Sequence, residues 1–353
     1  MTLRISELPP AMLGPSQILT RCRDLVEPAL KSSVNRLHPW PRRMVAFSFG
    51  WCDVDGTTVV DGGGKGVRQA LAVLSAEAAG ASARAAVDGA VAVELVHAFS
   101  LVHDDIMDGD EQRRHRDTVW KAYGTGPAVL AGDALFALAI QTVAGASNKY
   151  ACAATSHLAS ALTQLVNGQA EDIGFETRPW TGPDAVGVDE YRVMAEHKTG
   201  ALFGCASAIG AVLAGAPHPI VDALSAAGRH LGLAFQAVDD LLGIWGDPTV
   251  TGKPVFNDLR QRKKTLPMIA AIGSGTPASR RLAEFLPYRG RLDEQTLPYI
   301  VELIEQAGGQ SFARRESQEH LDRALQILKD APLIRPAAEE LAVLAGFLVQ
   351  RTS

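Results

Sequence analysis

The sequence is poor in cysteine and has no excess of positive charge. Only four cysteines occur among its 353 residues, Cys22, Cys52, Cys152 and Cys205, and no two of them form a CxxC pair. This spacing argues against a cysteine metal site or a disulfide framework, so we expect buried thiols in a reducing compartment and a cytoplasmic protein. The net charge of −5 gives no general attraction to nucleic acid or to an anionic membrane. We therefore expect no nucleic-acid partner.

Long hydrophobic runs are also scarce. The N-terminal stretch "MTLRISELPPAMLGPSQ" has no apolar core and does not resemble a secretory signal. Residues 201–217 ("ALFGCASAIGAVLAGAP") are uncharged and nearly long enough to cross a bilayer. Because this segment is rich in Ala, Gly and Ser and no aromatic or basic belt follows it, we expect a buried core helix and no membrane span.

Signals for β-strands are few, whereas helical patterns are frequent. The expected helices lie near residues 15–36, 66–79, 83–107, 127–145, 150–171, 189–214, 219–245, 265–273, 297–307, 311–329 and 335–350. The main expected loops are 37–64, 174–188 and 246–264, each longer than a simple connector. The pattern predicts an all-α fold in a single domain, 1–353, with residues 1–40 as an N-terminal extension.

The stretch "LVHDDIMDGDEQRRH" places several carboxylates at the end of an apolar helix. Asp104 and Asp108 are four residues apart, so both lie on one helix face, while Asp105 lies to its side. Carboxylates without His or Cys partners suit Mg²⁺. The alternative is a solvated acidic helix end, but negative charge there opposes the helix dipole.

A second acidic pair, Asp239 and Asp240, lies inside the apolar run "GLAFQAVDDLLGIWGD". Adjacent carboxylates among apolar neighbours are costly unless cations pair with them. If the two acidic helices face each other, they could hold several Mg²⁺ ions between them. Such ions need an anionic ligand to balance their charge, and a diphosphate is the obvious candidate.

Basic residues recur beside glycines and beside the acidic motifs. Lys65 and Arg68 lie in "GGGKGVRQ", where glycines let the backbone approach an anion. The others are Arg113, Arg114, Lys198 (in "EHKTG"), Lys253, Lys263 and Lys264. His97 precedes Asp104 by two helical turns and is a candidate anion contact, with a core histidine as the alternative. Taken singly, each basic residue is more often a surface charge; their repeated placement favours diphosphate binding.

Together these residues resemble the trans-isoprenyl diphosphate synthase family, also called polyprenyl synthetases. The resemblance runs from about residue 40 to the C-terminus. Its motifs are GGKxxR (Gly63, Gly64, Lys65, Arg68), DDxxD (Asp104, Asp105, Asp108), "AGDAL" at 131–135, "GQAED" at 168–172, "KTG" at 198–200 and "FQAVDDLLGIWGD" with "TGKP" after it. The resemblance implies a bundle of about ten or more helices around a central cavity, usually as a homodimer.

The resemblance also implies the chemistry. Three Mg²⁺ ions, replaceable by Mn²⁺, would bind the diphosphate of an allylic substrate, and isopentenyl diphosphate would attack the allylic carbon. The implied metal ligands are Asp104, Asp108 and Asp239, supported by Asp105 and Asp240. Arg113, Lys198 and Lys253 would hold the allylic diphosphate; Lys65, Arg68, His97 and Arg114 would hold isopentenyl diphosphate; Thr199 and Gln236 would lie near the reacting allyl group.

The sequence departs from the family pattern at the second acidic motif. It reads DDLLG, so Gly243 stands where DDxxD would have a third carboxylate. In the first basic motif, Gly66 and Gln69 replace the usual Arg and Pro. Phe99, five residues before Asp104, resembles the bulky residue that limits product length in this family. Together with the small Ser100 next to it and the lack of an insertion in the aspartate motif, Phe99 resembles synthases that stop near twenty carbons (geranylgeranyl diphosphate), with fifteen (farnesyl diphosphate) next.

Two other interpretations remain at this stage. A class I terpene cyclase also uses acidic helices and metal ions, but it typically lacks an isopentenyl diphosphate site, and here Lys65 and Arg68 are present while aromatic residues make up only 6% of the chain. A catalytically idle partner subunit commonly loses a DDxxD motif, whereas the first one here is intact. The sequence therefore favours an active prenyl synthase.

Overall fold

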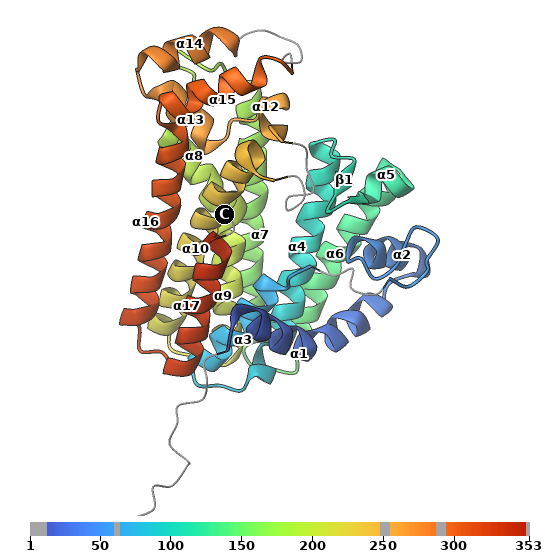
Figure 1. Ribbon diagram of the computed structural model, residues 1–353. Helices are drawn as coiled ribbons and strands as arrows, with labels where there is room; N and C mark the ends of the chain where they lie inside the picture. The colour runs from blue at the N-terminus through green and yellow to red at the C-terminus, as the bar shows by residue number, and fades with distance from the viewer. Residues whose placement is uncertain (1–12, 60–63, 248–254, 287–293, 351–353) are drawn as a thin grey trace, which may run out of the picture.

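The structure is a computed structural model that describes residues 13–59, 64–247, 255–286 and 294–350. Within these ranges it is helical apart from one short hairpin and an isolated bridge, which confirms the all-α prediction (Figure 1). The larger helices are α1 Pro15–Asn35, α3 Val67–Ala78, α4 Val87–Met107, α6 Thr125–Ala144, α7 Ala151–Glu176, α9 Ala201–Leu213, α10 His218–Trp245, α16 Gly309–Asp330 and α17 Arg335–Val349.

Shorter helices complete the fold. They are α2 Pro39–Ser48, α5 Val119–Tyr123, α8 Val188–Ala195, α12 Asn257–Arg260, α13 Leu266–Gly273, α14 Pro277–Phe285 and α15 Leu297–Gln306, with a 3₁₀ turn at Ala83–Ala86 and a π-turn, η2, at Glu196–Gly200. Strands β1 (Gln112–Arg113) and β2 (Arg116–Asp117) form an antiparallel hairpin. In Figure 1, α13, α14 and α15 gather at one end of the bundle, while α1, α3 and α17 lie at the other.

Helix α9 runs through the centre of the bundle. Nearly all its residues are buried, which confirms the prediction of a core helix within residues 201–217. Small residues let its neighbours approach closely: a Cβ added at Gly210 would lie 2.0 Å from the carbonyl oxygen of Ala72 on α3. The low side-chain bulk of this segment therefore serves close helix packing.

Several expectations for loops were wrong. The segment 37–64 contains helix α2, because Pro39 and Pro41 lie in the first turn of a helix, where their missing N–H groups cost nothing. Helix α2 buries Met44, Val45 and Phe47 against the core. The loop 246–264 contains the short α12, and α14 was not expected at all. These helices are short, and packing on the bundle stabilises them more than their own propensity does.

Two other helices are long and apolar enough to cross a membrane by length and composition alone, Ala83–Met107 and Thr125–Ala144. They pack against each other in the bundle as α4 and α6 (Figure 1). Core helices of soluble proteins meet the same criterion, so it does not by itself indicate a membrane protein.

Candidate active site

Both acidic pairs lie near the ends of long helices, Asp104 and Asp105 on α4 and Asp239 and Asp240 on α10. Consecutive helical residues point about 100° apart, so the two members of a pair cannot share one environment. Asp105 is 4% exposed and Asp240 is 5% exposed, whereas Asp239 is exposed and Asp104 is half-buried. In each pair, one carboxylate is therefore a candidate ligand and the other belongs to the protein interior.

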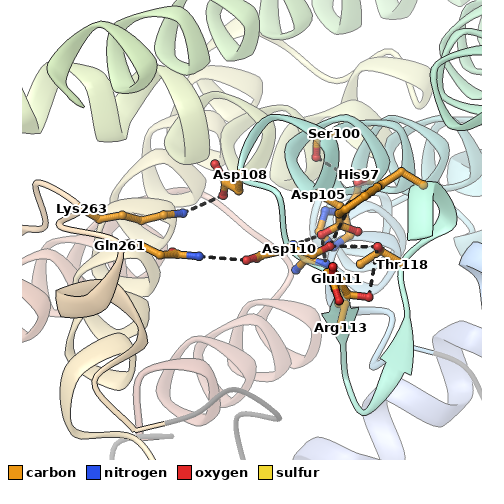
Figure 2. A network of polar contacts seen from close by, with 11 residues as sticks. His97, Ser100, Asp105, Asp108, Asp110, Glu111, Arg113, Thr118, Gln261 and Lys263 are labelled. Atoms are coloured by element: carbon orange, nitrogen blue, oxygen red, sulfur yellow. Dashed lines mark hydrogen bonds and ion pairs between the residues drawn. The ribbon is translucent and has the colours of Figure 1, made fainter. Parts of the chain in front are cut away.

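The buried member of the first pair is held by a cation. The Oδ1 atom of Asp105 accepts a hydrogen bond from Nε of Arg113 at 2.8 Å and lies 2.7 Å from its Nη2 (Figure 2). Burial alone would lower the pKa of Arg113, but the charge and hydrogen bond of Asp105 raise it above its ordinary value. Asp105 thus fixes the hairpin that follows α4. The expected contact of Arg113 with an allylic diphosphate stays a prediction.

The buried member of the second pair is held by neutral groups. Oδ2 of Asp240 accepts hydrogen bonds from the hydroxyl of Tyr191 at 2.5 Å and from the backbone N–H of Leu266 at 2.7 Å. Its Oδ1 accepts one from Nε2 of Gln236 at 2.9 Å, and Oε1 of Gln236 in turn accepts one from Thr199 at 2.6 Å. Burial raises the pKa of Asp240 to about 7, although these hydrogen bonds oppose the shift. Asp240 therefore ties α8, α10 and the start of α13 together.

Asp104 lies among charges of both signs. Burial raises the pKa of Asp104 to about 6; the ammonium group of Lys198 lowers it and the carboxylate of Asp108 raises it. Lys198 donates a hydrogen bond to Oδ2 of Asp172 on α7 at 2.5 Å. Burial alone would lower the pKa of Lys198, but Asp172 and Asp104 raise it above its ordinary value. The ammonium group of Lys198 therefore lies close to carboxylates of both α7 and α4.

The π-turn η2 places Lys198 and Thr199 at this site. It lies between α8 and α9, in the segment for which one helix, 189–214, was expected. A Cβ added at Gly168 of α7 would lie 2.2 Å from the backbone nitrogen of Lys198, so only glycine permits this approach. Single π-turns inside helices are frequent at functional sites.

Residues after the second acidic motif reach back to the first. Nζ of Lys263 donates a hydrogen bond to Oδ2 of Asp108 at 2.7 Å, and Nε2 of Gln261 donates one to Oδ1 of Asp110 at 3.2 Å (Figure 2). Asp108 raises the pKa of Lys263 against the effect of its burial. Sequence reasoning noted Lys263 as a basic residue but did not place it in the site, because nothing in its local pattern shows where the loop turns.

Arg68 and His97, predicted to share a site, are in contact. Nη1 of Arg68 lies 3.1 Å from Nε2 of His97, and its guanidinium carbon lies 4.5 Å from the ring centre of Phe203. Burial lowers the pKa of Arg68 to about 10, while Glu94 opposes the shift. Burial and the charge of Arg68 hold the pKa of His97 well below its ordinary value.

Glu94 belongs to the same cluster and was missed by sequence reasoning. Its signal is a lone acid in the apolar run "VAVELVHAF". Burial raises the pKa of Glu94, and Arg68 opposes the shift. Within the described residues, the buried Nε of Arg68 and Oε2 of Glu94 have no hydrogen-bond partner, so this cluster has capacity for a polar ligand.

The other predicted basic residues differ in how close they lie to Arg68 and His97. The charge of Arg114 acts on both Arg68 and His97, and a Cβ at Gly64 would lie 2.9 Å from Nη1 of Arg114. Nζ of Lys65 lies 5.5 Å from the ring centre of Phe347 on α17. Lys253 and Gly63 lie outside the described residues.

Phe99 packs toward α6. Its ring centre lies 4.9 Å from that of His103 and 5.5 Å from that of Phe136 on α6. Phe136 is itself 40% exposed. These contacts place the Phe99 ring against α6, and its effect on product length stays a prediction.

The carboxylates suit a metal that is shared with a ligand. Within the described ranges, no three His, Cys, Asp or Glu side chains lie close enough to hold a metal by themselves. Mg²⁺ is usually bound by one or two carboxylates together with phosphate oxygens and water. Asp104, Asp108 and Asp239 supply carboxylates only, so the donor set fits Mg²⁺ with a phosphorylated ligand and not a transition metal bound by His or Cys.

Comparison with known proteins identifies relatives along almost the whole chain. Residues 51–304 match the family model described as polyprenyl synthetase. The (2E,6E)-farnesyl diphosphate synthase of Mycobacterium tuberculosis (strain H37Rv) is 44% identical over 95% of this chain and 92% of that protein. The geranylgeranyl diphosphate synthase of the same strain is 41% identical over 91% of each. A crystal structure of a polyprenyl synthetase from Streptomyces coelicolor superposes with a TM-score of 0.88 and 48% identity, covering 94% of this chain and 98% of that one.

Proposed function

Because this chain belongs to the polyprenyl synthetase family, we propose that it is a trans-prenyltransferase that condenses isopentenyl diphosphate with an allylic diphosphate. The family predicted from the motifs is thereby confirmed. The observation that carries the proposal is the pairing across the site: Lys263, from the segment after the second acidic motif, bonds Asp108 of the first. The segment that follows the second acidic helix thus contacts the end of the first.

We assign one group of side chains to the allylic diphosphate and another to isopentenyl diphosphate. Asp104, Asp108 and Asp239 would hold Mg²⁺, which when bound supplies charge neutralisation for the departing diphosphate. Lys263, which bonds Asp108, and Lys198, whose charge acts on Asp104, would bind the same diphosphate.

The second substrate is assigned to the basic cluster on α3 and α4. Arg68, His97 and Arg114 would bind isopentenyl diphosphate, and the unpartnered Nε of Arg68 supports an anion there. With its pKa lowered, His97 is neutral at pH 7, so one ring nitrogen donates a hydrogen bond and the other accepts one. The hydrogen-bonded pair Thr199 and Gln236 would orient the reacting allyl group.

The proposed product is geranylgeranyl diphosphate, with farnesyl diphosphate as the second choice. The support is the bulky Phe99 five residues before Asp104 and the small Ser100 next to it. Relatives of both product classes are similarly identical to this chain, at 44% and 41%. Product length therefore has to be measured on this protein.

We also propose that the protein is a homodimer in the cytoplasm. Large apolar side chains are exposed on neighbouring helices: Val129, Leu130 and Phe136 on α6 and Val166 and Ile173 on α7. An apolar patch of this kind on adjacent helices suits an interface with a second copy. Size-exclusion chromatography with light scattering tests it; a monomer at micromolar concentration would contradict it.

The activity is tested by incubating purified protein with labelled isopentenyl diphosphate, Mg²⁺ and allylic primers of five, ten or fifteen carbons. We expect a diphosphate product of twenty or fifteen carbons after chromatography, and none when EDTA replaces Mg²⁺. No elongated product from any primer would overturn the proposal. A hydrocarbon formed from an allylic diphosphate without isopentenyl diphosphate would indicate a cyclase instead.

A further inference from the structure

The second acidic motif has glycine, Gly243, in place of a third carboxylate. A side chain from another element lies next to this glycine. Gly243 follows Asp239 by four residues on α10, so both lie on the same helix face. A Cβ added at Gly243 would lie 1.9 Å from Oδ2 and 2.4 Å from Cγ of Asp258. The carboxylate of Asp258, on α12, therefore already occupies the space into which a side chain at position 243 would extend.

The frame around Asp258 holds it in this place. Phe256 and Arg262, on either side of α12, have φ angles of 63° and 55°, which non-glycine residues adopt at some energetic cost. Arg260 forms a two-pronged ion pair with Glu294, with hydrogen bonds of 2.7 and 2.8 Å, and Leu259 is 1% exposed. The buried Leu259 and the Arg260–Glu294 ion pair therefore fix the short helix that carries Asp258.

The same segment connects the two acidic regions. The charge of Asp258 acts on Asp240 of the second motif and on Lys263, and Lys263 in turn bonds Asp108 of the first motif at 2.7 Å. Asp258 thus lies on the face of α10 that carries Asp239, among these charged groups. A carboxylate at this position could supply a further oxygen to a bound metal.

We propose that Asp258 supplies from α12 the third carboxylate of the second acidic site, in the volume that Gly243 leaves open. This inference rests on the proposed function, since it assigns a further residue to the Mg²⁺ and diphosphate site near Asp239. Gly243 is then not a loss of a ligand: glycine at this position is what admits the ligand from α12. A purely structural role of Asp258 would affect stability without changing metal affinity.

The first test measures metal binding without turnover. Mn²⁺ is titrated into the full-length protein with inorganic diphosphate present, and free Mn²⁺ is followed by electron paramagnetic resonance. Asp258→Asn preserves the shape of the side chain and removes its charge. We expect it to weaken Mn²⁺ binding by about 10- to 100-fold. The matched control is Asp322→Asn, an exposed change on α16, which leaves binding unaltered.

The second test moves the carboxylate. Gly243→Ala introduces the Cβ that meets Asp258, so it should displace that carboxylate and weaken Mn²⁺ binding as Asp258→Asn does. It tests the proposal even if Asp258→Asn folds poorly. The double variant Gly243→Asp with Asp258→Ala returns a carboxylate from α10 and should recover most of the lost affinity. Failure of this recovery, or wild-type affinity in both Asp258→Asn and Gly243→Ala, would overturn the inference.

The two proposals fail in distinguishable ways. If wild-type protein does not bind Mn²⁺ with diphosphate, the proposed function itself is in error. If wild-type protein binds both and the Asp258 and Gly243 variants bind equally well, only the assignment of Asp258 is lost. Circular dichroism of each variant at the assay temperature shows that a loss of binding is not a loss of fold.

Discussion

The two aspartate pairs are placed alike on α4 and α10, but the buried member of each is held by different chemistry. Asp105 is bound by the guanidinium group of Arg113, a cation. Asp240 is bound by a hydroxyl, a side-chain amide and a backbone N–H, all neutral. The first pair therefore keeps a compensated charge inside the protein, whereas the second buries a carboxyl group whose pKa is raised to about 7. A DD motif thus combines one candidate metal ligand with one structural anchor, and the anchor can be ionic or neutral.

The largest expected effect comes from the members that face the site. Asp104→Ala and Asp239→Ala should each lower kcat/KM by at least about 10³-fold, or about 4 kcal/mol, because a metal ligand is lost at the leaving-group step. Steady-state assays at saturating Mg²⁺ measure this, with Asp322→Ala as control. If Asp104→Ala kept activity while Asp105→Asn abolished it, the assignment of site-facing and buried members would be reversed.

The next largest effect should be the difference in stability between the two anchors. Asp105→Asn leaves the guanidinium group of Arg113 partly buried without its counter-charge, and we expect a loss of about 3 kcal/mol in the free energy of unfolding. Asp240→Asn keeps an acceptor for Tyr191 and Leu266 and loses about one hydrogen bond, so we expect about 1 kcal/mol. Urea unfolding in metal-free buffer compares them; equal losses would contradict the distinction between ionic and neutral anchors.

A smaller effect should appear in the pH dependence of stability. An aspartate has a pKa of about 3.9 in the unfolded chain, and the folded pKa of Asp240 is about 7. The folded state therefore binds more protons between these values, and the stability contributed by Asp240 falls as pH rises from about 4 to about 7. In Asp240→Asn this slope is absent.

The measurement is the free energy of unfolding of wild type and Asp240→Asn in EDTA at several pH values. The destabilisation by Asp240→Asn should shrink as pH rises from 5 to 7, by at most about 1.4 kcal/mol per pH unit. Asp104, whose pKa is also raised, is present in both proteins and cancels in the difference. A destabilisation that stays constant over this range would show that Asp240 is ionised throughout.

Sequence reasoning could predict the helical fold and the nature of the site, because helix periodicity and the cost of adjacent carboxylates are local properties. It named Asp105 and Asp240 beside the metal ligands, but it could not show which groups bury them, since that depends on how each helix is rotated against its neighbours. The partners Arg113 and Tyr191 come from other elements.

The contacts of α12 and of Lys263 after it could not be predicted from the sequence for a related reason. Lys263 and Asp258 lie in a segment expected to be a loop, and no local pattern in the sequence links them to their neighbours Asp108 and Gly243. Only the path of the chain between α10 and α13 brings them together. Gly243 in particular reads as a missing ligand in the sequence, whereas the structure gives its open space an occupant.

The smallest effect in energy is expected from a phenylalanine on each acidic helix. The measured quantity is the length of the product. Each carries a phenylalanine about one turn before its aspartates, Phe99 on α4 and Phe235 on α10. Phe99 contacts Phe136 of α6, whereas the ring of Phe235 lies 5.3 Å from that of Phe203, which stacks under Arg68. Phe99→Ala should lengthen the product by one or more five-carbon units, because it opens space on the α6 side.

Phe235→Ala is the matched control, since it removes the same ring from the other acidic helix. We expect it to raise the KM for isopentenyl diphosphate through the loosened packing of Phe203 under Arg68, with product length unchanged. Chromatography of products from one primer decides between them. If Phe235→Ala lengthened the product and Phe99→Ala did not, the hydrocarbon would extend along α10 and not toward α6. In that case α10, and not α4, would limit product length, while the aspartates of both helices would keep their proposed roles in metal binding.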